Sequence, residues 1–346
     1  MKGGPIMSLQ KEFLDFNDRI KLDYETKKEL ADKRDILIDI LQNSDRLPSF
    51  SHFNQGSYGM HLGTEPVNGR EYDIDVGLKF HVNKEDYEPT DIKNTIADIL
   101  KDHTDYGATI KKPCVTVTYK KNGEAAYHVD LVTYAYEDCQ DANSQLFLAH
   151  GKDSVPDEIT WEKSDPIGLL DYITASVTQG NARDQFRRII RYLKRWKHLY
   201  FSNSGHSEPA SIGITLIAAD TFVKYEDNDL EALFNIVKAI QNLFVPTKFE
   251  NNRWLYRIKC PMPSILNFSS NTDAFGKMTD VKMTDFKDKI EKLAKDLQAV
   301  KDEVDEAEQC KMLQKIFDSD FHVPDAKDVS KQQRNYIPSS SASGMA

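Results

Sequence analysis

The chain is poor in cysteine, in long apolar runs and in positive charge. No apolar run reaches the length of about 20 residues that a membrane helix needs, and no secretory signal is visible, so we expect a cytoplasmic protein with no membrane partner. The net charge of −10 argues against a stable nucleic-acid partner, because nonspecific binding to nucleic acid needs a cationic surface. The few cysteines lie far apart without a paired Cys-x-x-Cys, which argues against a zinc module or a disulfide framework: Cys114, Cys139, Cys260 and Cys310.

The size and composition are those of an ordinary globular protein. The chain has 346 residues, of which 40% are apolar and 29% charged. This length suffices for two domains or for one bilobal unit with a cleft between its lobes.

A short segment of alternating residues carries two carboxylates. Asp73 and Asp75 flank Ile74 inside an apolar run, and strand side chains alternate between faces, so both carboxylates project from the same side. A second apolar run, His128 to Val132, carries Asp130, which a neighbouring strand would bring beside the first pair. Three like charges in one place need a cation, so we interpret the cluster as a site for two Mg²⁺ or Mn²⁺ ions.

A glycine-serine turn precedes the first carboxylates. Gly56 and Ser57 permit backbone amides and a hydroxyl to approach phosphate oxygens closely, and Gln55 stands beside them. Taken singly, a Gly-Ser pair is more often a structural turn, and an Asp-x-Asp more often a solvated strand edge. Together they predict a nucleotidyltransferase site in which a triphosphate lies between the turn and the metals.

The pattern along the chain predicts an α+β protein of two lobes. Residues 1–160 are expected to form a lobe with a mixed sheet and one or two long N-terminal helices, from Leu9 to Gln42, that brace both lobes. A helix from Thr90 to Asp102 and a hairpin that delivers Asp130 are expected in it. The polar stretch from Asp138 to Pro166 is expected to cross to a mostly helical lobe of residues 161–324, and residues 325–346 to form a flexible tail.

The helix predicted over Asn181–Tyr200 has seven arginines and lysines between Arg183 and Lys197. In an acidic chain, such a cationic face is suited to holding a triphosphate. The alternative is a solvated face whose cations pair with carboxylates. A later charged helix, Asp285 to Gln309, is expected to face solvent with ion pairs along it.

These residues resemble the CD-NTases, the cyclic-oligonucleotide synthases of bacterial anti-phage defence and relatives of cyclic GMP-AMP synthase and oligoadenylate synthase. The resemblance covers most of the chain in the right order. The Gly-Ser turn and the double aspartate mark the wider polymerase-β-like superfamily, and later segments narrow it, among them Ile190–Lys197, Pro209–Leu216, Pro261–Asn267 and Leu313–Phe321. The spacing from Ser57 to Asp73 is longer than expected, with an enlarged turn from Val67 to Glu71.

The resemblance implies a polymerase-β-like lobe, a helical lobe and an active site in the cleft between them. It implies that Asp73 and Asp75 bind both metal ions, and that Asp130 binds the one that activates the acceptor hydroxyl. It further implies that the triphosphate is contacted from the helical lobe by Lys194, Arg191 and Ser211. The substrates would be ATP, GTP or pyrimidine triphosphates, as donor and as acceptor, and the product, with a dinucleotide favoured over a trinucleotide, would reach an effector.

Other readings stay open at this level. A nucleotidyltransferase of the same fold that acts on RNA or protein, and a catalytically silent nucleotide-binding scaffold, are both alternatives. In some related operons a ubiquitin-ligase-like protein joins the synthase's C-terminus to targets, so conjugation of the tail is a further hypothesis. The bases joined, the 2′ or 3′ linkage, the trigger and the oligomeric state leave no mark in the sequence.

Overall fold

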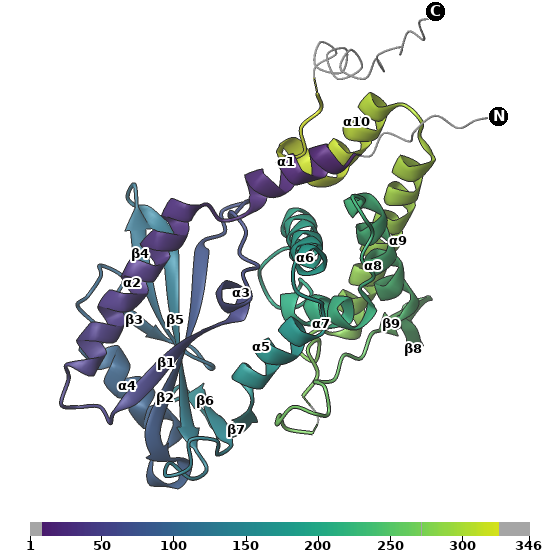
Figure 1. Cartoon of the computed structure of the whole chain (residues 1–346). Helices are drawn as coiled ribbons and strands as arrows, with labels where there is room; N and C mark the ends of the chain where they lie inside the picture. The colour runs from purple at the N-terminus through teal and green to yellow at the C-terminus, as the bar shows by residue number, and fades with distance from the viewer. Residues whose placement is uncertain (1–8, 271, 325–346) are drawn as a thin grey trace, which may run out of the picture.

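The computed structural model describes residues 9–270 and 272–324, which form two lobes side by side (Figure 1). The predicted tail, residues 325–346, lies outside the described residues. Within the described part of the chain, no helix has the length and apolar character needed to cross a membrane. The α+β class and the arrangement of a mixed-sheet lobe beside a helical lobe are confirmed.

The first lobe is built on a seven-stranded mixed sheet in which β1 to β5 take the order β1-β2-β5-β4-β3. β2 and β5 run parallel, while β1 and β4 flank them antiparallel. Alternate residues of β2, from Ile74 to Phe80, are fully buried, and they pack in one core with α2 and α4. The elements of this lobe are α2 (Tyr24–Gln42), β1 (Phe50–Gln55), α3 (Gly56–Gly59), β2 (Tyr72–Asn83), α4 (Pro89–Leu100), β3 (Ala108–Ile110), β4 (Val115–Lys121) and β5 (Glu124–Tyr136).

Residues 138–166 lead into the helical lobe at Pro166, but they also form a hairpin that was not predicted. This polar stretch forms the hairpin of β6 (Leu146–Lys152) and β7 (Val155–Ser164), which extends the sheet from the end of β5. Most β7 side chains are exposed or half-buried, because the strand lies at the outer edge of the sheet. An edge strand has little need of apolar residues, which explains why its composition suggested a linker.

The second lobe is a bundle of helices around one large core. It was expected to be mostly helical, and it also holds a two-stranded hairpin, β8 and β9, whose first strand is exposed along its whole length. Its elements are α5 (Pro166–Ala175), α6 (Asn181–Tyr200), α7 (Ser211–Thr221), α8 (Asp229–Asn242), β8 (Val245–Glu250), β9 (Arg253–Arg257), α9 (Asp280–Asp302) and α10 (Glu306–Phe317).

The N-terminal segment forms two helices, one for each lobe. α1 (Gln10–Ile20) ends where Lys21 becomes extended, and Asp23 caps the next helix by accepting a hydrogen bond from the Thr26 amide at 2.7 Å. The buried face of α1 joins the core of the helical lobe, whereas α2 joins the core under the sheet. The segment predicted as the first lobe, residues 1–160, therefore includes one helix, α1, that packs in the core of the other lobe. The predicted domain boundary at residue 160 stays a prediction.

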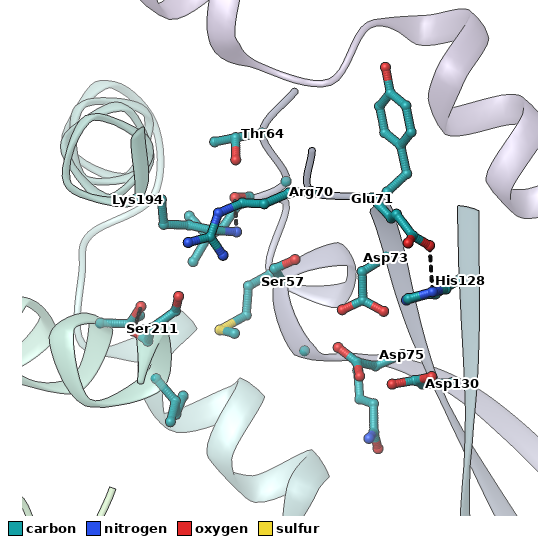
Figure 2. Close-up of a pocket in the computed structure, with 18 of the residues that line it drawn as sticks. Ser57, Thr64, Arg70, Glu71, Asp73, Asp75, His128, Asp130, Lys194 and Ser211 are labelled. Atoms are coloured by element: carbon teal, nitrogen blue, oxygen red, sulfur yellow. Dashed lines mark hydrogen bonds and ion pairs between the residues drawn. The ribbon is translucent and has the colours of Figure 1, made fainter. Parts of the chain in front are cut away.

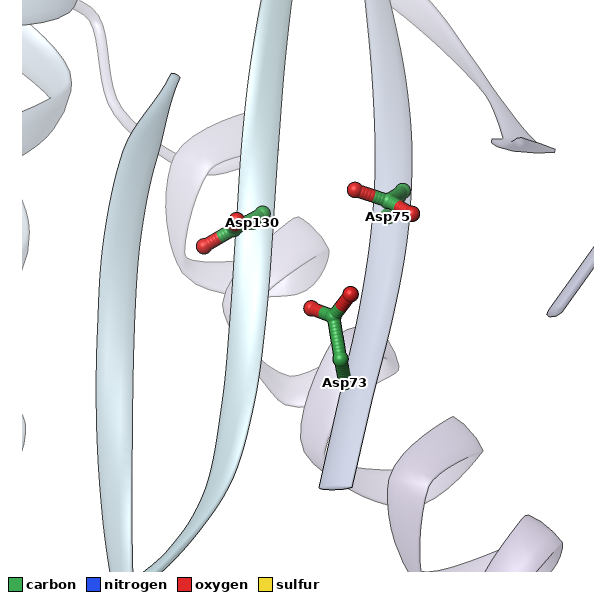
Figure 3. A group of neighbouring side chains, drawn as sticks. All are labelled: Asp73, Asp75 and Asp130. Atoms are coloured by element: carbon green, nitrogen blue, oxygen red, sulfur yellow. The ribbon is translucent and has the colours of Figure 1, made fainter. Parts of the chain in front are cut away.

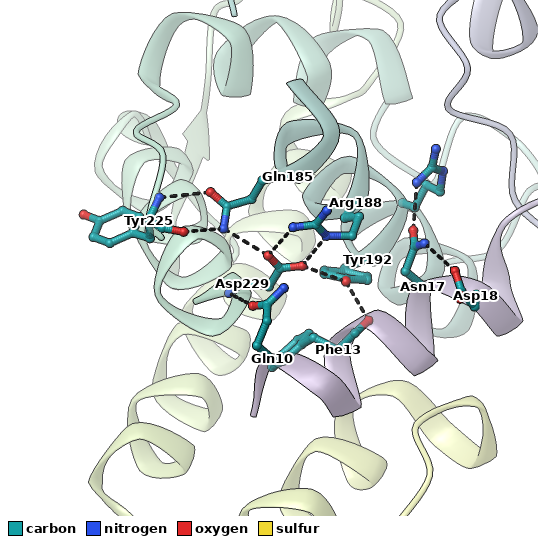
Figure 4. A network of polar contacts seen from close by, with 10 residues as sticks. Gln10, Phe13, Asn17, Asp18, Gln185, Arg188, Tyr192, Tyr225 and Asp229 are labelled. Carbon is teal, nitrogen blue, oxygen red and sulfur yellow. Dashed lines mark hydrogen bonds and ion pairs between the residues drawn. The ribbon is translucent and has the colours of Figure 1, made fainter. Parts of the chain in front are cut away.

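A buried polar network fixes α1 and α8 to α6 (Figure 4). The fully buried carboxylate of Asp229 accepts hydrogen bonds from Gln185 at 3.0 Å, from Arg188 at 2.7 and 2.8 Å, and from the Tyr192 hydroxyl at 2.9 Å. The same hydroxyl lies 2.7 Å from the backbone oxygen of Phe13 on α1. Since a buried charge is costly without partners, this set of contacts holds the three helices in one arrangement.

The late charged helix is only partly exposed to solvent. α9 carries ion pairs between side chains four residues apart, such as Lys287 with Glu291, as expected. Its other face, with Phe286, Ile290 and Leu297 fully buried, packs in the core of the helical lobe. The helix is thus amphipathic and part of the bundle.

Candidate active site

The register of two parallel strands brings the three predicted carboxylates together (Figure 3). Asp75 on β2 lies directly opposite Asp130 on β5, and Asp73 lies opposite His128. One oxygen from each of the three carboxylates lies within 4.8 Å of the others. Ile74 and Val129, the intervening residues, are fully buried on the other face, so alternation along the strands is what places all three carboxylates on the cleft side.

Proximity and burial raise the pKa values of this cluster. The pKa of Asp75 rises to about 6, first because burial removes water from its carboxylate and then because Asp130 is close. The pKa of Asp73 is raised well above its ordinary value, by the same loss of hydration and by the charges of Asp75 and Asp130. The cluster therefore disfavours full ionisation unless a cation is present.

Asp130 is the carboxylate with neighbours that orient it. The Thr116 hydroxyl on β4 donates a hydrogen bond to Oδ1 of Asp130. The Lys111 ammonium lies 3.8 Å from the same oxygen. Because both groups approach Oδ1, Oδ2 remains for another ligand or for a proton. Neither Thr116 nor Lys111 was predicted from the sequence, since neither belongs to a motif.

The Gly-Ser turn lies against the carboxylates. Gly56 has a φ of +58°, and a Cβ atom there would lie 1.9 Å from Oδ2 of Asp75, so the position requires glycine on two counts. Ser57 follows in the single helical turn of α3 and lines the same cleft. Gln55 pairs with Asp75 across the strands, and its side-chain oxygen accepts a hydrogen bond from the Tyr134 hydroxyl at 3.0 Å.

The cleft between the lobes has a volume of about 730 Å³ and is shown in Figure 2. The sheet lobe supplies Gly56, Ser57 and the three carboxylates to its lining. The helical lobe supplies Lys194 from α6 and Ser211 from the start of α7. Lys194 is only 9% exposed, and its ammonium donates to the backbone oxygen of Leu62 at 2.9 Å. Burial lowers the pKa of Lys194 to about 8.

Arg191, the third predicted contact from the helical lobe, does not line this cleft. Its guanidinium donates to Oδ1 of Asn17 at 2.7 Å and to the backbone oxygen of His61 at 2.9 Å. It thereby ties α6 to α1 and to the segment after α3. The resemblance implied that Arg191 contacts the nucleotide together with Lys194. A shift of three residues turns a side chain by about 60° around the helix, so the two side chains point in different directions.

The cations of α6 are for the most part internal. Arg188 pairs with buried Asp229, and Arg195, which is 1% exposed, lies 3.1 Å from Asp320. Neither of the two readings of this helix was complete, since these charges hold the lobe together and form no continuous solvent-facing surface. Lys197 differs, because its ammonium reaches the cleft, where it donates to the Ser211 hydroxyl at 2.8 Å. Lys197 follows Lys194 by three residues, and residues at this spacing are neighbours on a helix surface, so the sequence could have predicted that it also lines the cleft.

The donor set of the carboxylate cluster fits a divalent cation. Asp73, Asp75 and Asp130 offer hard oxygen ligands at one point, and such ligands suit Mg²⁺ or Mn²⁺. Burial and the charge of Asp130 raise the pKa of Asp75 to about 6, although the charges of Lys194 and Lys111 act in the opposite direction. The Lys111 ammonium lies 3.8 Å from Oδ1 of Asp130, and the charges of Lys194 and Lys111 both lower the pKa values of Asp73 and Asp75 in part.

Comparison of sequences finds a matching domain and distant relatives. Residues 50–134, from β1 almost to the end of β5, match the DncV-like cyclic GMP-AMP synthase nucleotidyltransferase domain. A cyclic GMP-AMP synthase from Escherichia albertii is 24% identical over 204 residues, which are 57% of this chain and 44% of that protein. A c-di-GMP synthase from Roseivirga ehrenbergii is 22% identical over 237 residues, 63% of this chain and 59% of that protein. The chain thus matches about half the length of these relatives.

Comparison of structures extends the likeness of fold to both lobes. Vibrio cholerae DncV in its apo form superposes with a TM-score of 0.69 at 16% identity, covering 91% of this chain and 96% of that one. The CD-NTase CdnG from Bradyrhizobium diazoefficiens, solved in complex with GTP, gives a TM-score of 0.69 at 11% identity, covering 92% and 98%. Residues 50–134 thus match a DncV-like nucleotidyltransferase domain, and over both lobes this chain has the fold of DncV and of the CD-NTase CdnG.

Proposed function

We propose that this chain is a template-independent nucleotidyltransferase that joins ribonucleoside triphosphates into a cyclic oligonucleotide, with a cyclic dinucleotide favoured. The observation that carries this proposal is the convergence of Asp73, Asp75 and Asp130, with oxygens within 4.8 Å, beside the Gly56-Ser57 turn. Relatives named as cyclic GMP-AMP and c-di-GMP synthases support the product class. We place the activity in cytoplasmic anti-phage signalling, with an effector reached through the product.

The three carboxylates would hold two Mg²⁺ or Mn²⁺ ions. When bound, such cations neutralise negative charge on the attacking and leaving oxygens of a phosphoryl transfer. The turn at Gly56 and Ser57 would hold the donor's phosphates, and Lys194 and Ser211 would approach them from the other wall of the cleft. Gln55 borders the same site and supports the turn rather than the metals.

The reaction follows from these positions. The ribose hydroxyl oxygen of the acceptor forms a bond to the α-phosphorus of the donor, the bond from that phosphorus to the oxygen bridging to the β-phosphate breaks, and pyrophosphate leaves. Asp130 accepts the hydroxyl proton at Oδ2, since Thr116 and Lys111 approach Oδ1. A second transfer within the linear intermediate closes the ring.

The size of the cleft favours a nucleotide as the acceptor. Its volume of about 730 Å³ is in the upper part of the range for small-molecule sites, roughly 300–1,000 Å³. Transfer to RNA or to a protein remains the alternative function, and it requires a macromolecular acceptor. A catalytically silent scaffold is the other alternative, and the intact set of three carboxylates argues against it.

The experiment that tests the proposal is product analysis. The purified protein is incubated with all four ribonucleoside triphosphates and Mg²⁺ or Mn²⁺, treated with phosphatase and analysed by mass spectrometry, beside the Asp73→Ala/Asp75→Ala variant. A phosphatase-resistant cyclic product from the wild type alone supports the proposal and identifies its bases. Nucleotide incorporation that appears only after RNA or protein is added favours the alternative acceptors. Conjugation of residues 325–346 to targets stays a separate prediction, outside the described residues.

A further inference from the structure

The segment between α3 and β2, which includes the enlarged turn, belongs to the sheet lobe and contacts the helical lobe. The Asn68 side chain donates to the backbone oxygen of His198, at 3.1 Å. The Arg70 guanidinium donates to the backbone oxygen of Phe201 at 3.2 Å and to Oε2 of Glu208 at 2.6 Å. Arg70 is thereby fixed, with only 13% of its side chain exposed, although it belongs to a loop.

Glu208 joins Arg70 to a cation of the opposite lobe. Its other oxygen, Oε1, lies 3.3 Å from the ammonium of Lys197, which is 4% exposed. That ammonium also donates to the hydroxyl of Ser211 at 2.8 Å. Arg70 and Lys197 thus meet at one carboxylate, and all four side chains line the cleft.

This wall of the cleft carries more positive than negative charge. Arg70, Lys194 and Lys197 contribute three cations, and Glu208 is the one carboxylate that the described contacts place among them. His198, beside them, has a pKa lowered to about 2 by burial and by the neighbouring cations, so it adds no charge. Its Nδ1 atom is buried and has no partner within the described residues. Such a wall is suited to an anion with several oxygens.

We propose that Arg70 is a direct contact to the polyphosphate of the bound nucleotide, delivered across the cleft by the 64–71 segment and positioned by Glu208. This inference rests on the proposed function, and it adds to it the basis for selecting triphosphates. The α-phosphate must lie at the three carboxylates for transfer to occur. Figure 2 shows the Arg70 guanidinium on the Lys194 side of the cleft, away from the carboxylates. A phosphate chain that starts at the carboxylates and extends toward Lys194 would place its terminal phosphate beside Arg70.

The chemistry of the side chain agrees with this role. A guanidinium has five N–H donors in a rigid fork, and the contacts described for Arg70 use its Nη2 atom. Donors at Nη1 and Nε therefore remain for phosphate oxygens. A nucleoside monophosphate, bound with its one phosphate at the carboxylates, would not reach them. Arg70 thus reports the length of the phosphate chain and is indifferent to the base.

The test is a binding measurement that needs no turnover. Isothermal titration calorimetry compares the wild type with Arg70→Gln, in Mg²⁺, for tripolyphosphate, a non-hydrolysable nucleoside triphosphate and the matching monophosphate. We expect Arg70→Gln to weaken both triphosphate ligands by about tenfold or more, as for the loss of a charge-assisted hydrogen bond, and to change monophosphate binding by less than about twofold. Arg70→Lys keeps the positive charge but loses the forked set of donors. Its affinity for the triphosphate ligands is expected to lie between those of the wild type and of Arg70→Gln.

A matched control is Arg46→Gln. Arg46 also forms an ion pair, with Asp98 at 2.7 Å, in the same lobe but outside the cleft, and its replacement should leave every affinity unchanged. Equal weakening of tri- and monophosphate by Arg70→Gln, or no weakening, overturns the inference. If Arg70→Gln does not fold, Arg70→Lys decides by the same comparison. Should the wild type bind neither tripolyphosphate nor any triphosphate, the proposed function fails first, whereas wild-type binding with no effect at Arg70 refutes this inference alone.

Discussion

Asp75→Asn should stabilise the metal-free protein. Asp75 is half-buried, and one of its carboxylate oxygens lies within 4.8 Å of a carboxylate oxygen of Asp73 and of one of Asp130. Its pKa, about 6 in the folded state against an ordinary value of 3.8, means that folding raises the cost of its negative charge. Asparagine has nearly the same shape without the charge, so the variant removes the cost and retains the packing.

The magnitude follows from the shift in pKa. A rise of about two units corresponds to about 3 kcal/mol of stability lost when the group is ionised. The sign is opposite to that of a carboxylate in an ion pair. The cost is absent below the unfolded pKa of 3.8, grows as pH rises, and is complete above about 6. For a chain of this size, about 3 kcal/mol corresponds to a gain in Tm of roughly 5 °C at pH 7.5. Asp73 shifts in the same direction, but more of its surface than that of Asp75 remains accessible to solvent, so water screens part of its contribution.

The assay is thermal unfolding in EDTA at pH 7.5 and at pH 5, followed by titration with MgCl₂. Asp75→Asn should melt higher than the wild type at pH 7.5, by a margin that shrinks at pH 5, and Mg²⁺ should raise the Tm of the wild type more than that of the variant. The control is Asp157→Asn, at an exposed position of β7, which should change neither value. A lower Tm for Asp75→Asn at pH 7.5 in EDTA would refute the reasoning, since Asp75 would then stabilise the fold by itself.

Three further substitutions, one of them with a matched control, test the site and the contacts that hold the fold together. Gly56→Ala should abolish nucleotidyl transfer, because the new methyl group would lie 1.9 Å from Oδ2 of Asp75. The control is Gly123→Ala, which is also at positive φ but has open space around it. This control should lower stability by only about 1–2 kcal/mol and leave activity unchanged. Arg191→Ala should lower the free energy of unfolding by about 1–3 kcal/mol in a urea titration, through its lost contacts to Asn17 and His61, and should leave triphosphate affinity at the wild-type value in calorimetry. Lys93→Met should cost about 2 kcal/mol in the same titration, because the buried ammonium donates to backbone oxygens, including that of Lys112 at 2.8 Å.

The carboxylate cluster was predictable because its pattern is local. Alternation along a strand fixes the face of Asp73 and Asp75, and the apolar neighbours of Asp130 fix its face in the same way. Only the pairing of β2 with β5 had to be assumed, and the structure confirms it with Asp75 directly opposite Asp130. The bounds of the helix Asn181–Tyr200 were also predicted correctly, because its 3.6-residue period is strong.

Contacts between the lobes could not be read in this way. Arg191 and Lys194 look alike on a helix, and only the packing of α1 and of the segment after α3 shows that one is structural and the other lines the cleft. Arg70 was missed for the same reason, since its partners Phe201 and Glu208 lie more than 130 residues away in the sequence. The enlarged turn was noticed, but its role depends on what it reaches.

The measurement that tests the central claim most directly is a crystal structure with Mn²⁺ and a non-hydrolysable nucleoside triphosphate. We predict anomalous difference peaks between the carboxylates of Asp73, Asp75 and Asp130, with the phosphate chain running from them past Ser57 to Arg70. Manganese bound at other residues, or a triphosphate whose α-phosphate lies away from the three carboxylates, would contradict the account.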